Sequence, residues 1–120
     1  MKDTEAQLEE QKATLRQEAF ARRLAVPQAD RADAAKAAAD VFLEGVPLQK
    51  DQVVALYWPI CDEIDCKPLL TRLMDSGQKV ALPVVISEDE PLELRLWEDG
   101  QPLYPSGFGT LAPAEAAPIV

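Results

Sequence analysis

The chain has 120 residues, enough for one domain that hides roughly two thirds of its unfolded surface. Apolar residues make up 48% and charged residues 28% of the sequence, which is ordinary for a globular protein and excludes a disordered one. The formal net charge of −9 argues against duplex nucleic acid or an anionic membrane as a partner, because phosphates would be repelled.

Two cysteines, Cys61 and Cys66, and the lack of histidine restrict the metal and redox chemistry of the chain. A disulfide framework needs more cysteines at this length, and a zinc site needs two further ligands at a suitable spacing. We therefore expect no metal site and a structural or incidental role for both thiols.

Residues 1–5 alternate in charge without an apolar signal core behind them, and no apolar run reaches the length of a membrane span. We expect a cytoplasmic protein.

Two helices are predicted in the first part of the chain. Residues 4–24 are rich in Glu, Gln, Lys, Arg, Ala and Leu and contain no Gly or Pro, which favours one long helix. Pro27 ends this helix, and a second one is predicted over residues 28–44. Lys12 and Arg16 lie one turn apart along the edge of the apolar stripe of the first helix. They are either solvated partners of neighbouring glutamates or a pair that binds one polyanion.

A strand, a helix and a second strand are predicted in the middle of the chain. Residues 53–58 and 79–86 are apolar runs of the kind that forms buried strands. Between them lie a loop with three carboxylates and a leucine-rich helix over residues 66–76, for which Asp65 is the expected N-cap and Gly77 the C-cap. Such a unit is right-handed and makes its two strands parallel. The acidic loop should therefore lie at the carboxyl end of a strand, the edge where open α/β sheets bind ligands.

The remaining segments complete a small α/β fold. Residues 92–97 alternate apolar and polar side chains, which predicts a half-exposed edge strand or an antiparallel addition. Residues from 101 on show no helical or strand period, and residues 112–120 are expected to be a proline- and alanine-rich linker or unpaired tail. The predicted fold is a single α/β domain over residues 1–120, three-layered and Rossmann-like, with helices on both faces of a mostly parallel sheet. Three strands are fewer than usual, so we expect an incomplete domain.

Six short segments follow one another in a characteristic order: KATLR at 12–16, with Arg22 and Arg23 beyond it, VALYWP at 54–59, DEID at 62–65, GQKVALP at 77–83, LRLW at 94–97 and GFG at 107–109. The series covers nearly all of the chain and resembles the 5-formyltetrahydrofolate cyclo-ligase (methenyltetrahydrofolate synthetase) family. The resemblance implies an ATP-dependent ring closure: the formyl oxygen of 5-formyltetrahydrofolate is phosphorylated, the second nitrogen attacks, and phosphate leaves to give 5,10-methenyltetrahydrofolate. It also implies ATP and Mg²⁺, because phosphoryl transfer depends on positioning and charge stabilisation.

The resemblance also implies roles for four residues. Lys12 and Arg16 match nucleotide-phosphate contacts, and Glu63 matches a folate-contacting glutamate, whose carboxylate can accept two N–H bonds from the pterin. Trp58 would line the folate pocket, where a flat pterin can stack on an aromatic ring. The residues alone favour a loop acid near a helix start for Glu63 and a core position for Trp58. We expect the cationic pair and Glu63 to converge on one cleft.

Two departures from the family pattern shape the functional expectation. Family members continue through further strands and a Gly-rich loop ending in Tyr-Tyr-Asp, which holds the ATP phosphates and supplies a magnesium ligand. The chain has no such segment, and its GFGTLAP run at 107–113 lacks the Ile-Pro-Glu-Pro continuation that the family often shows. We expect a front half of the fold that is inactive by itself, with a missing C-terminal half or a homo-oligomer as partner. The alternative is a non-catalytic binding or oligomerisation module that offers a sheet edge.

Overall fold

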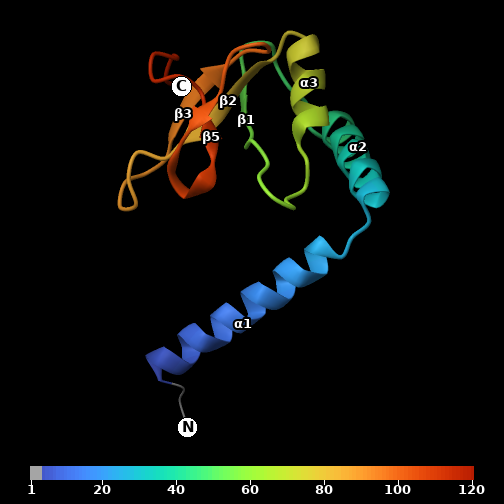
Figure 1. Ribbon diagram of the computed structural model, residues 1–120. Coiled ribbons are helices and arrows are strands. Elements are labelled where there is room, and N and C mark those ends of the chain that lie inside the picture. The colour runs from blue at the N-terminus through green and yellow to red at the C-terminus, as the bar shows by residue number, and fades with distance from the viewer. Residues whose placement is uncertain (1–3) are drawn as a thin grey trace.

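The computed structural model describes residues 4–120 and contains three α-helices, a three-stranded sheet and a small two-stranded sheet (Figure 1). The mixed α/β class predicted from the sequence is confirmed. In chain order the elements are α1 (Glu5–Leu24), α2 (Gln28–Gly45), β1 (Val53–Ala55), α3 (Lys67–Asp75), β2 (Lys79–Val84), β3 (Glu93–Trp97), β4 (Tyr104–Pro105), the 3₁₀ turn Gly107–Gly109 and β5 (Leu111–Ala112).

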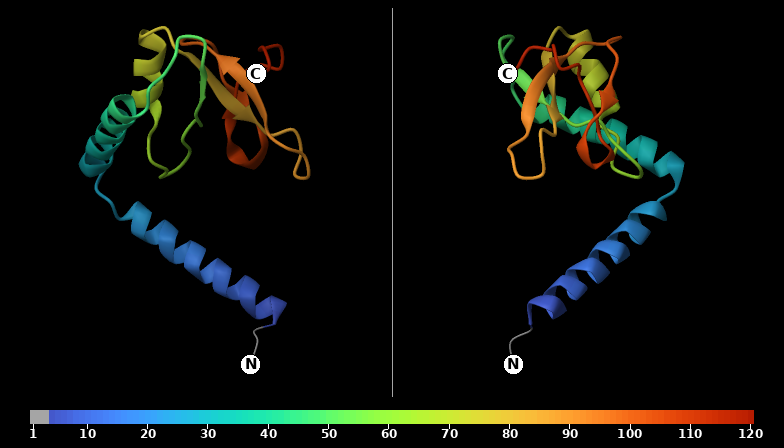
Figure 2. Two further views of the ribbon diagram at one scale, coloured as in Figure 1. Left: turned by 180° about the vertical axis from the view of Figure 1, so that it is seen from behind. Right: turned by 60° about the vertical axis from the view of Figure 1, so that its left-hand side comes forward.

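The main sheet has the strand order β1-β2-β3. β1 is parallel to β2, with Val54 opposite Val80, and α3 connects them, so the predicted βαβ unit is confirmed. β3 is antiparallel to β2, as its alternating pattern indicated. One strand pair is thus parallel and the other antiparallel, a more mixed sheet than expected. α2 and α3 lie together at one side of this sheet, and α1 extends away from it (Figures 1 and 2).

β1 is shorter than the apolar run that predicted it. Its pairing continues by one bond, from the Leu56 N–H to the Ala81 carbonyl at 3.0 Å. Beyond this point Trp58 packs against the core, where its ring meets Trp97 in an edge-on contact with centroids 5.7 Å apart. Leu56 and Trp58 therefore serve core packing rather than a longer strand, while Tyr57 between them is exposed.

The core lies between α3 and the main sheet. It consists of Leu70 and Leu73 from α3, Val80 and Leu82 from β2, and Trp97 from β3, all buried. The end of α2 packs against this cluster through Phe42 and Leu43. Leucines three residues apart face the same side of a helix, so both Leu70 and Leu73 pack against the sheet and anchor this short helix there.

At the ends of α3 the predicted glycine cap is confirmed, whereas the prediction of Asp65 as N-cap is wrong, because the N-cap is Cys66 and no side chain caps the helix there. Asp65 Oδ1 accepts a bond from the Lys67 N–H at 2.9 Å, although the N-cap position itself is Cys66. Gly77 has a φ of 86° and follows the last turn. The next N–H, that of Gln78, bonds to the Leu73 carbonyl at 2.9 Å. This is the arrangement in which a left-handed glycine satisfies the free carbonyls of a helix end.

α1 is held by local interactions more than by packing. Its cap is reciprocal, since Gln7 N–H donates to Thr4 Oγ1 at 3.2 Å and Thr4 N–H donates to Gln7 Oε1 at 2.7 Å. The structure describes every residue of α1, and none of them is buried. α1 therefore covers no face of the sheet. Within residues 4–120, no helix is both long enough and apolar enough to cross a bilayer.

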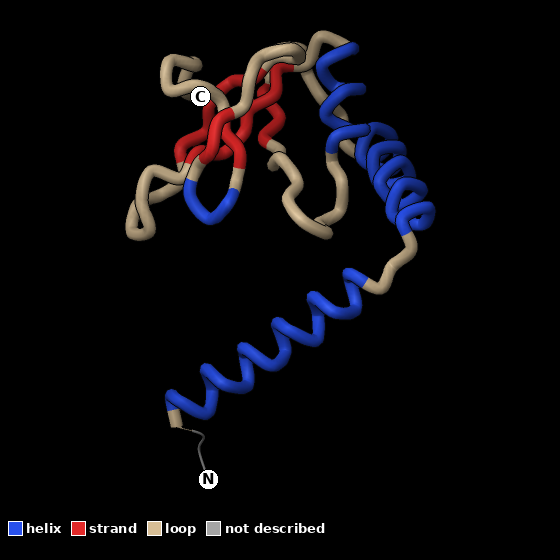
Figure 3. The backbone as a smooth tube through the Cα atoms, viewed as in Figure 1, coloured by secondary structure: helices blue, strands red, loops and turns tan. Residues whose placement is uncertain are grey.

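The C-terminal segment corrects the expectation of a linker or an unpaired tail over residues 112–120. Leu111 and Ala112 belong to β5, which pairs with β4. Residues 118–120 lie along β3, with the Leu96 N–H bonded to the Pro118 carbonyl and the Val120 N–H to the Leu94 carbonyl, both at 2.9 Å. Figure 3 shows this tail beside the strands. An edge strand leaves backbone groups free, and the tail satisfies those of β3.

Candidate functional site

The candidate site is the loop of residues 59–66, which follows β1 and precedes α3. It lies at the carboxyl end of β1, where the sequence predicted it, and faces the end of α1 and the start of α2 (Figure 1). Two hollows adjoin this loop, and Cys61 and Glu63 line both of them. The loop therefore forms part of the wall of both hollows.

The first hollow, called here the apolar hollow, has a volume of about 480 Å³. It lies between the last turns of α1 and the loop. Its walls are largely hydrocarbon, with charged groups from Arg23, Asp62 and Glu63. The lining residues are Phe20, Ala21, Arg23, Leu24, Ile60, Cys61, Asp62 and Glu63.

The second hollow, called here the polar hollow, has a volume of about 240 Å³. It lies between the first turns of α2 and the loop, and it combines two cations with two carboxylates. The lining residues are Gln28, Arg31, Ala32, Pro59, Cys61, Glu63, Asp65 and Lys67.

Glu63 is oriented by its own loop. Its Oε1 accepts a hydrogen bond from the Ile60 N–H at 2.8 Å, and its own N–H donates to the Ile60 carbonyl at 3.2 Å. Cys61, inside this turn, has a φ of 53°, a left-handed conformation uncommon for a residue with a side chain. Among the described residues no other group donates to the Glu63 carboxylate. One carboxylate oxygen thus anchors the side chain to its own loop.

Asp62, the neighbour of Glu63, forms the ion pair that connects the loop to α1. Its Oδ1 lies 3.1 Å from Arg23 Nη2, and its side chain is only 9% exposed. The hydrogen bond from Arg23 lowers the pKa of the Asp62 carboxyl. The same bond raises the pKa of the Arg23 guanidinium. Both groups are therefore charged near neutral pH. The sequence alone gives no sign of this ion pair, because its two partners lie 39 residues apart.

Trp58 has the contacts of a core residue. It packs on the buried cluster and on Trp97, and the Lys67 ammonium lies 5.2 Å from the centre of its ring. Trp58 is not among the residues that line the two hollows. Its predicted role in lining a folate pocket stays a prediction.

Lys12 and Arg16 lie on the exposed part of α1. Lys12 Nζ is 3.3 Å from Glu9 Oε1, which is the solvated pairing that the pattern alone suggested. Neither residue lines the apolar or the polar hollow, and Lys12 precedes Arg23 by about 16 Å along the helix axis. The structure does not bring the cationic pair and Glu63 into the shared cleft that we expected. The reason is that α1 extends away from the loop beyond its last turns (Figure 2).

Three cations near Glu63 were not assigned from sequence. Arg23 and Arg31 come from the end of α1 and the start of α2, and Lys67 begins α3. Arg23 belongs to the family pattern, which gives it no role of its own. Their positions in the sequence could have indicated them. Arg23 and Arg31 flank the break between two helices and Lys67 follows the acidic loop, and these segments meet at the same edge of the fold.

The two thiols of the loop differ in environment. Cys61 is exposed, whereas Cys66 is half-buried and its Sγ donates to the Tyr57 carbonyl oxygen at 2.7 Å. Burial raises the pKa of the Cys66 thiol, which lowers its thiolate fraction near neutral pH.

Iodoacetamide near neutral pH is therefore expected to modify Cys61 before Cys66, with the Cys66 reaction accelerating as the pH is raised. Peptide mass spectrometry over a time course measures both rates. A Cys61→Ser variant should keep only the slow reaction. Equal rates at the two thiols in the native chain would contradict this prediction.

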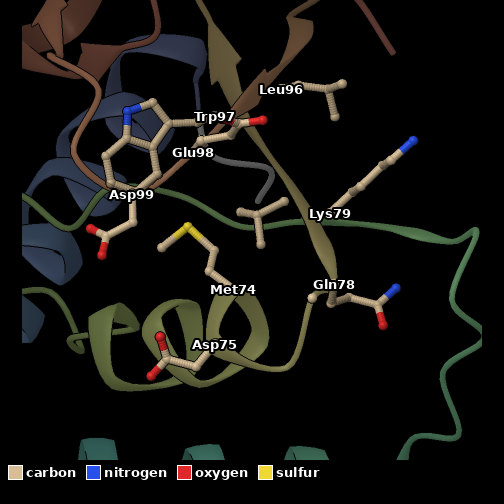
Figure 4. Close-up of a pocket in the computed structure, with 10 residues that line it drawn as sticks. Met74, Asp75, Gln78, Lys79, Leu96, Trp97, Glu98 and Asp99 are labelled. Atoms are coloured by element: carbon tan, nitrogen blue, oxygen red, sulfur yellow. The ribbon is translucent and has the colours of Figure 1, made fainter.

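A further hollow of about 330 Å³ lies at the opposite end of the main sheet, beside the start of β2 and the end of α3 (Figure 4). Met74 and Trp97 lie near its centre, and the Lys79 side chain points away from Asp75 and Asp99. Within the described part of the chain, no group of three or more His, Cys, Asp or Glu side chains is placed to hold a metal ion. This hollow lies away from the strand end that carries Glu63, and we do not assign it a role.

Comparison with known proteins agrees with the fold. The model of the 5-formyltetrahydrofolate cyclo-ligase family matches residues 8–118. A solution structure of the 5,10-methenyltetrahydrofolate synthetase of Aquifex aeolicus is similar, with a TM-score of 0.69 and 25% sequence identity, over 91% of this chain and 54% of that one. This chain thus spans about half the length of that structure. No curated protein matches the chain. Since the family match covers nearly the whole sequence, the chain belongs to the 5-formyltetrahydrofolate cyclo-ligase family.

Proposed function

We propose that the chain acts in the ATP-dependent cyclisation of 5-formyltetrahydrofolate to 5,10-methenyltetrahydrofolate, and that the loop around Glu63 is its substrate site. Membership of the family supports the reaction class. The observation that carries the site is the Glu63 carboxylate, which is anchored by the Ile60 N–H at 2.8 Å where two hollows meet. A pre-oriented carboxylate loses little conformational entropy when a ligand binds to it.

The chemistry of the apolar hollow suits a folate. The amino-pyrimidinone edge of a pterin presents adjacent N–H donors, which a carboxylate accepts with good geometry. Phe20, Leu24 and Ile60 supply hydrocarbon surface for a flat ring beside Glu63. A volume of about 480 Å³ lies within the range of roughly 300–1,000 Å³ that is common for small-molecule sites.

In this reaction ATP supplies a phosphoryl group to the formyl oxygen. The second nitrogen then attacks the formyl carbon, and the phosphorylated oxygen leaves as phosphate. We assign Lys12 and Arg16 to the nucleotide phosphates on the family pattern. Both lie outside the two hollows that Glu63 lines, so the assignment concerns nucleotide binding and not the transfer step. Both are exposed on α1 and free of burial, so they can reach an anion in solvent. We assign no residue to Mg²⁺, because the described residues offer no cluster of ligands for it.

Lys12→Ala and Arg16→Ala are each expected to weaken MgATP binding by about three- to tenfold, because each removes one cation from the phosphates at an exposed site. Isothermal titration calorimetry of the full chain with MgATP measures the dissociation constants. Lys36→Ala, which removes an exposed lysine from α2, is the matched control and should change nothing. Identical affinities in all four proteins would overturn the assignment.

The reaction itself is tested with the full chain, 5-formyltetrahydrofolate and MgATP, followed by the absorbance of the methenyl product. Binding of 5-formyltetrahydrofolate is measured separately by calorimetry. Binding without turnover would support the substrate site and restrict the chain to a binding role. No binding at substrate concentrations well above those typical of enzymes would contradict the proposal.

A second candidate is a non-catalytic binding or oligomerisation module. The observation that favours it is the exposure of large apolar side chains on α1, where Leu15 is 63% and Leu24 69% exposed. An exposed apolar helix face commonly marks an interaction surface. Size-exclusion chromatography with light scattering distinguishes the two: a monomer that binds 5-formyltetrahydrofolate favours the enzyme, and a dimer without affinity for the folate favours the module.

A further inference from the structure

The contact between α1 and the loop is made by the last turns of α1 alone. Phe20, Ala21, Arg23 and Leu24 face the loop across the apolar hollow. The ion pair between Arg23 and Asp62 is the salt bridge that joins α1 to the rest of the described chain. Because no residue of α1 is buried, packing contributes little to its orientation, and polar contacts of this kind gain in importance.

The ion pair is buried on the Asp62 side, whereas the Arg23 side chain is 41% exposed. The Asp62 side chain is nine-tenths buried, and its Oδ2 has no hydrogen-bond partner among the described residues. The Nε of Arg23 is likewise buried and unpartnered. Asp62 Oδ2 is an acceptor and Arg23 Nε a donor. A small rotation of either side chain would add a second hydrogen bond between them, beside the one from Nη2 to Oδ1, and satisfy both atoms. The Arg23 guanidinium also lies 5.0 Å from the centre of the Phe20 ring.

The contact continues into α2. Arg31 Nη2 donates to the Arg23 carbonyl at 2.5 Å, and Arg31 Nε donates to the Val26 carbonyl at 2.9 Å. The first bond occupies a carbonyl in the last turn of α1, the second a carbonyl in the connection to α2, and together they stabilise the turn between the two helices. A chain of polar contacts thus runs from the start of α2, through the end of α1, to the residue next to Glu63.

We propose that the Arg23–Asp62 pair is a latch that holds the end of α1 against the loop and thereby positions Glu63 for the substrate. The assignment of Glu63 rests on the proposed function. Asp62 and Glu63 are adjacent, and Glu63 lines the same hollow as Arg23. Releasing Asp62 frees the backbone turn that aims the Glu63 carboxylate and opens the α1 wall of the apolar hollow. Arg23 and Asp62 are therefore positioning residues that need not touch the substrate.

A double-mutant cycle tests the latch. Asp62→Asn and Arg23→Gln should each weaken binding of 5-formyltetrahydrofolate by about tenfold, and the double variant should lose no more than either single one, because both remove the same interaction. Calorimetry on the full chain measures the affinities. Hydrogen exchange without ligand should rise at residues 20–24 and 59–66 in all three variants. Asp40→Asn, which removes an exposed ion pair with Arg72 between α2 and α3, is the matched control.

The outcomes separate the latch from the proposed function. If the native chain binds the folate and the two single changes leave affinity and exchange unaltered, or if their effects simply add, the latch is overturned and the substrate site stands. If the native chain binds no folate, the proposed function is overturned, and the positioning role falls with it even where exchange rises. A loss of affinity in Asp40→Asn equal to that in Asp62→Asn would mean general destabilisation and would also overturn the latch.

Discussion

Glu63→Gln is expected to weaken binding of 5-formyltetrahydrofolate by about 30- to 100-fold, which is the largest functional effect of any single change that we foresee. Glutamine keeps the size of the side chain, and its amide oxygen can still accept the bond that the Ile60 N–H makes at 2.8 Å. It loses the negative charge, and its NH₂ group opposes the N–H donors of the pterin edge. A charge-assisted pair of hydrogen bonds therefore becomes a mismatch.

Calorimetric titration of the native and variant chains measures this effect. Glu88→Gln, in the exposed turn after β2, is the matched control, because it makes the same chemical change away from both hollows. The melting temperatures should be nearly equal, since Glu63 is not part of the core. Equal folate affinity in the Glu63→Gln and native chains would remove Glu63 from the site.

Leu82→Ala is expected to lower the free energy of unfolding by about 3 kcal/mol, because it leaves a cavity in a closely packed core. Leu82 is 0% exposed and belongs to the buried cluster between α3 and the sheet. It also lies in the central strand, so the cavity is bordered by both β1 and β3. Net stabilities of small domains are only about 5–15 kcal/mol, and this single change removes a large part of that margin.

Urea unfolding monitored by circular dichroism measures the loss. Leu92→Ala is the control at an exposed position, since Leu92 is 59% exposed just before β3, and its effect should stay within about 0.5 kcal/mol. A similar loss in both variants would show that burial in the sheet is not what stabilises the domain.

Local patterns in the sequence were sufficient for most of the elements. The composition of residues 4–24 predicted α1, and leucines at helical spacing predicted α3 and its buried face. The short connection between two apolar strands determined the parallel pair, because a right-handed crossover is nearly the only way to join them. These features depend on residues that are close together in the sequence, so the sequence pattern is enough to predict them. The family pattern also points to Glu63 in the loop after β1, and its role stays a prediction.

What the tertiary structure alone decided is which distant groups meet. The pattern did not show that β1 ends at Ala55, which follows from the packing of Trp58 on the core. It did not show that residues 118–120 lie along β3, since their pairing depends on a free strand edge elsewhere in the chain. Above all, it did not show that Arg23 meets Asp62 while Lys12 stays apart from Glu63. A helix can be predicted from its own residues, but its direction depends on contacts at its ends, and those exist only in the folded chain.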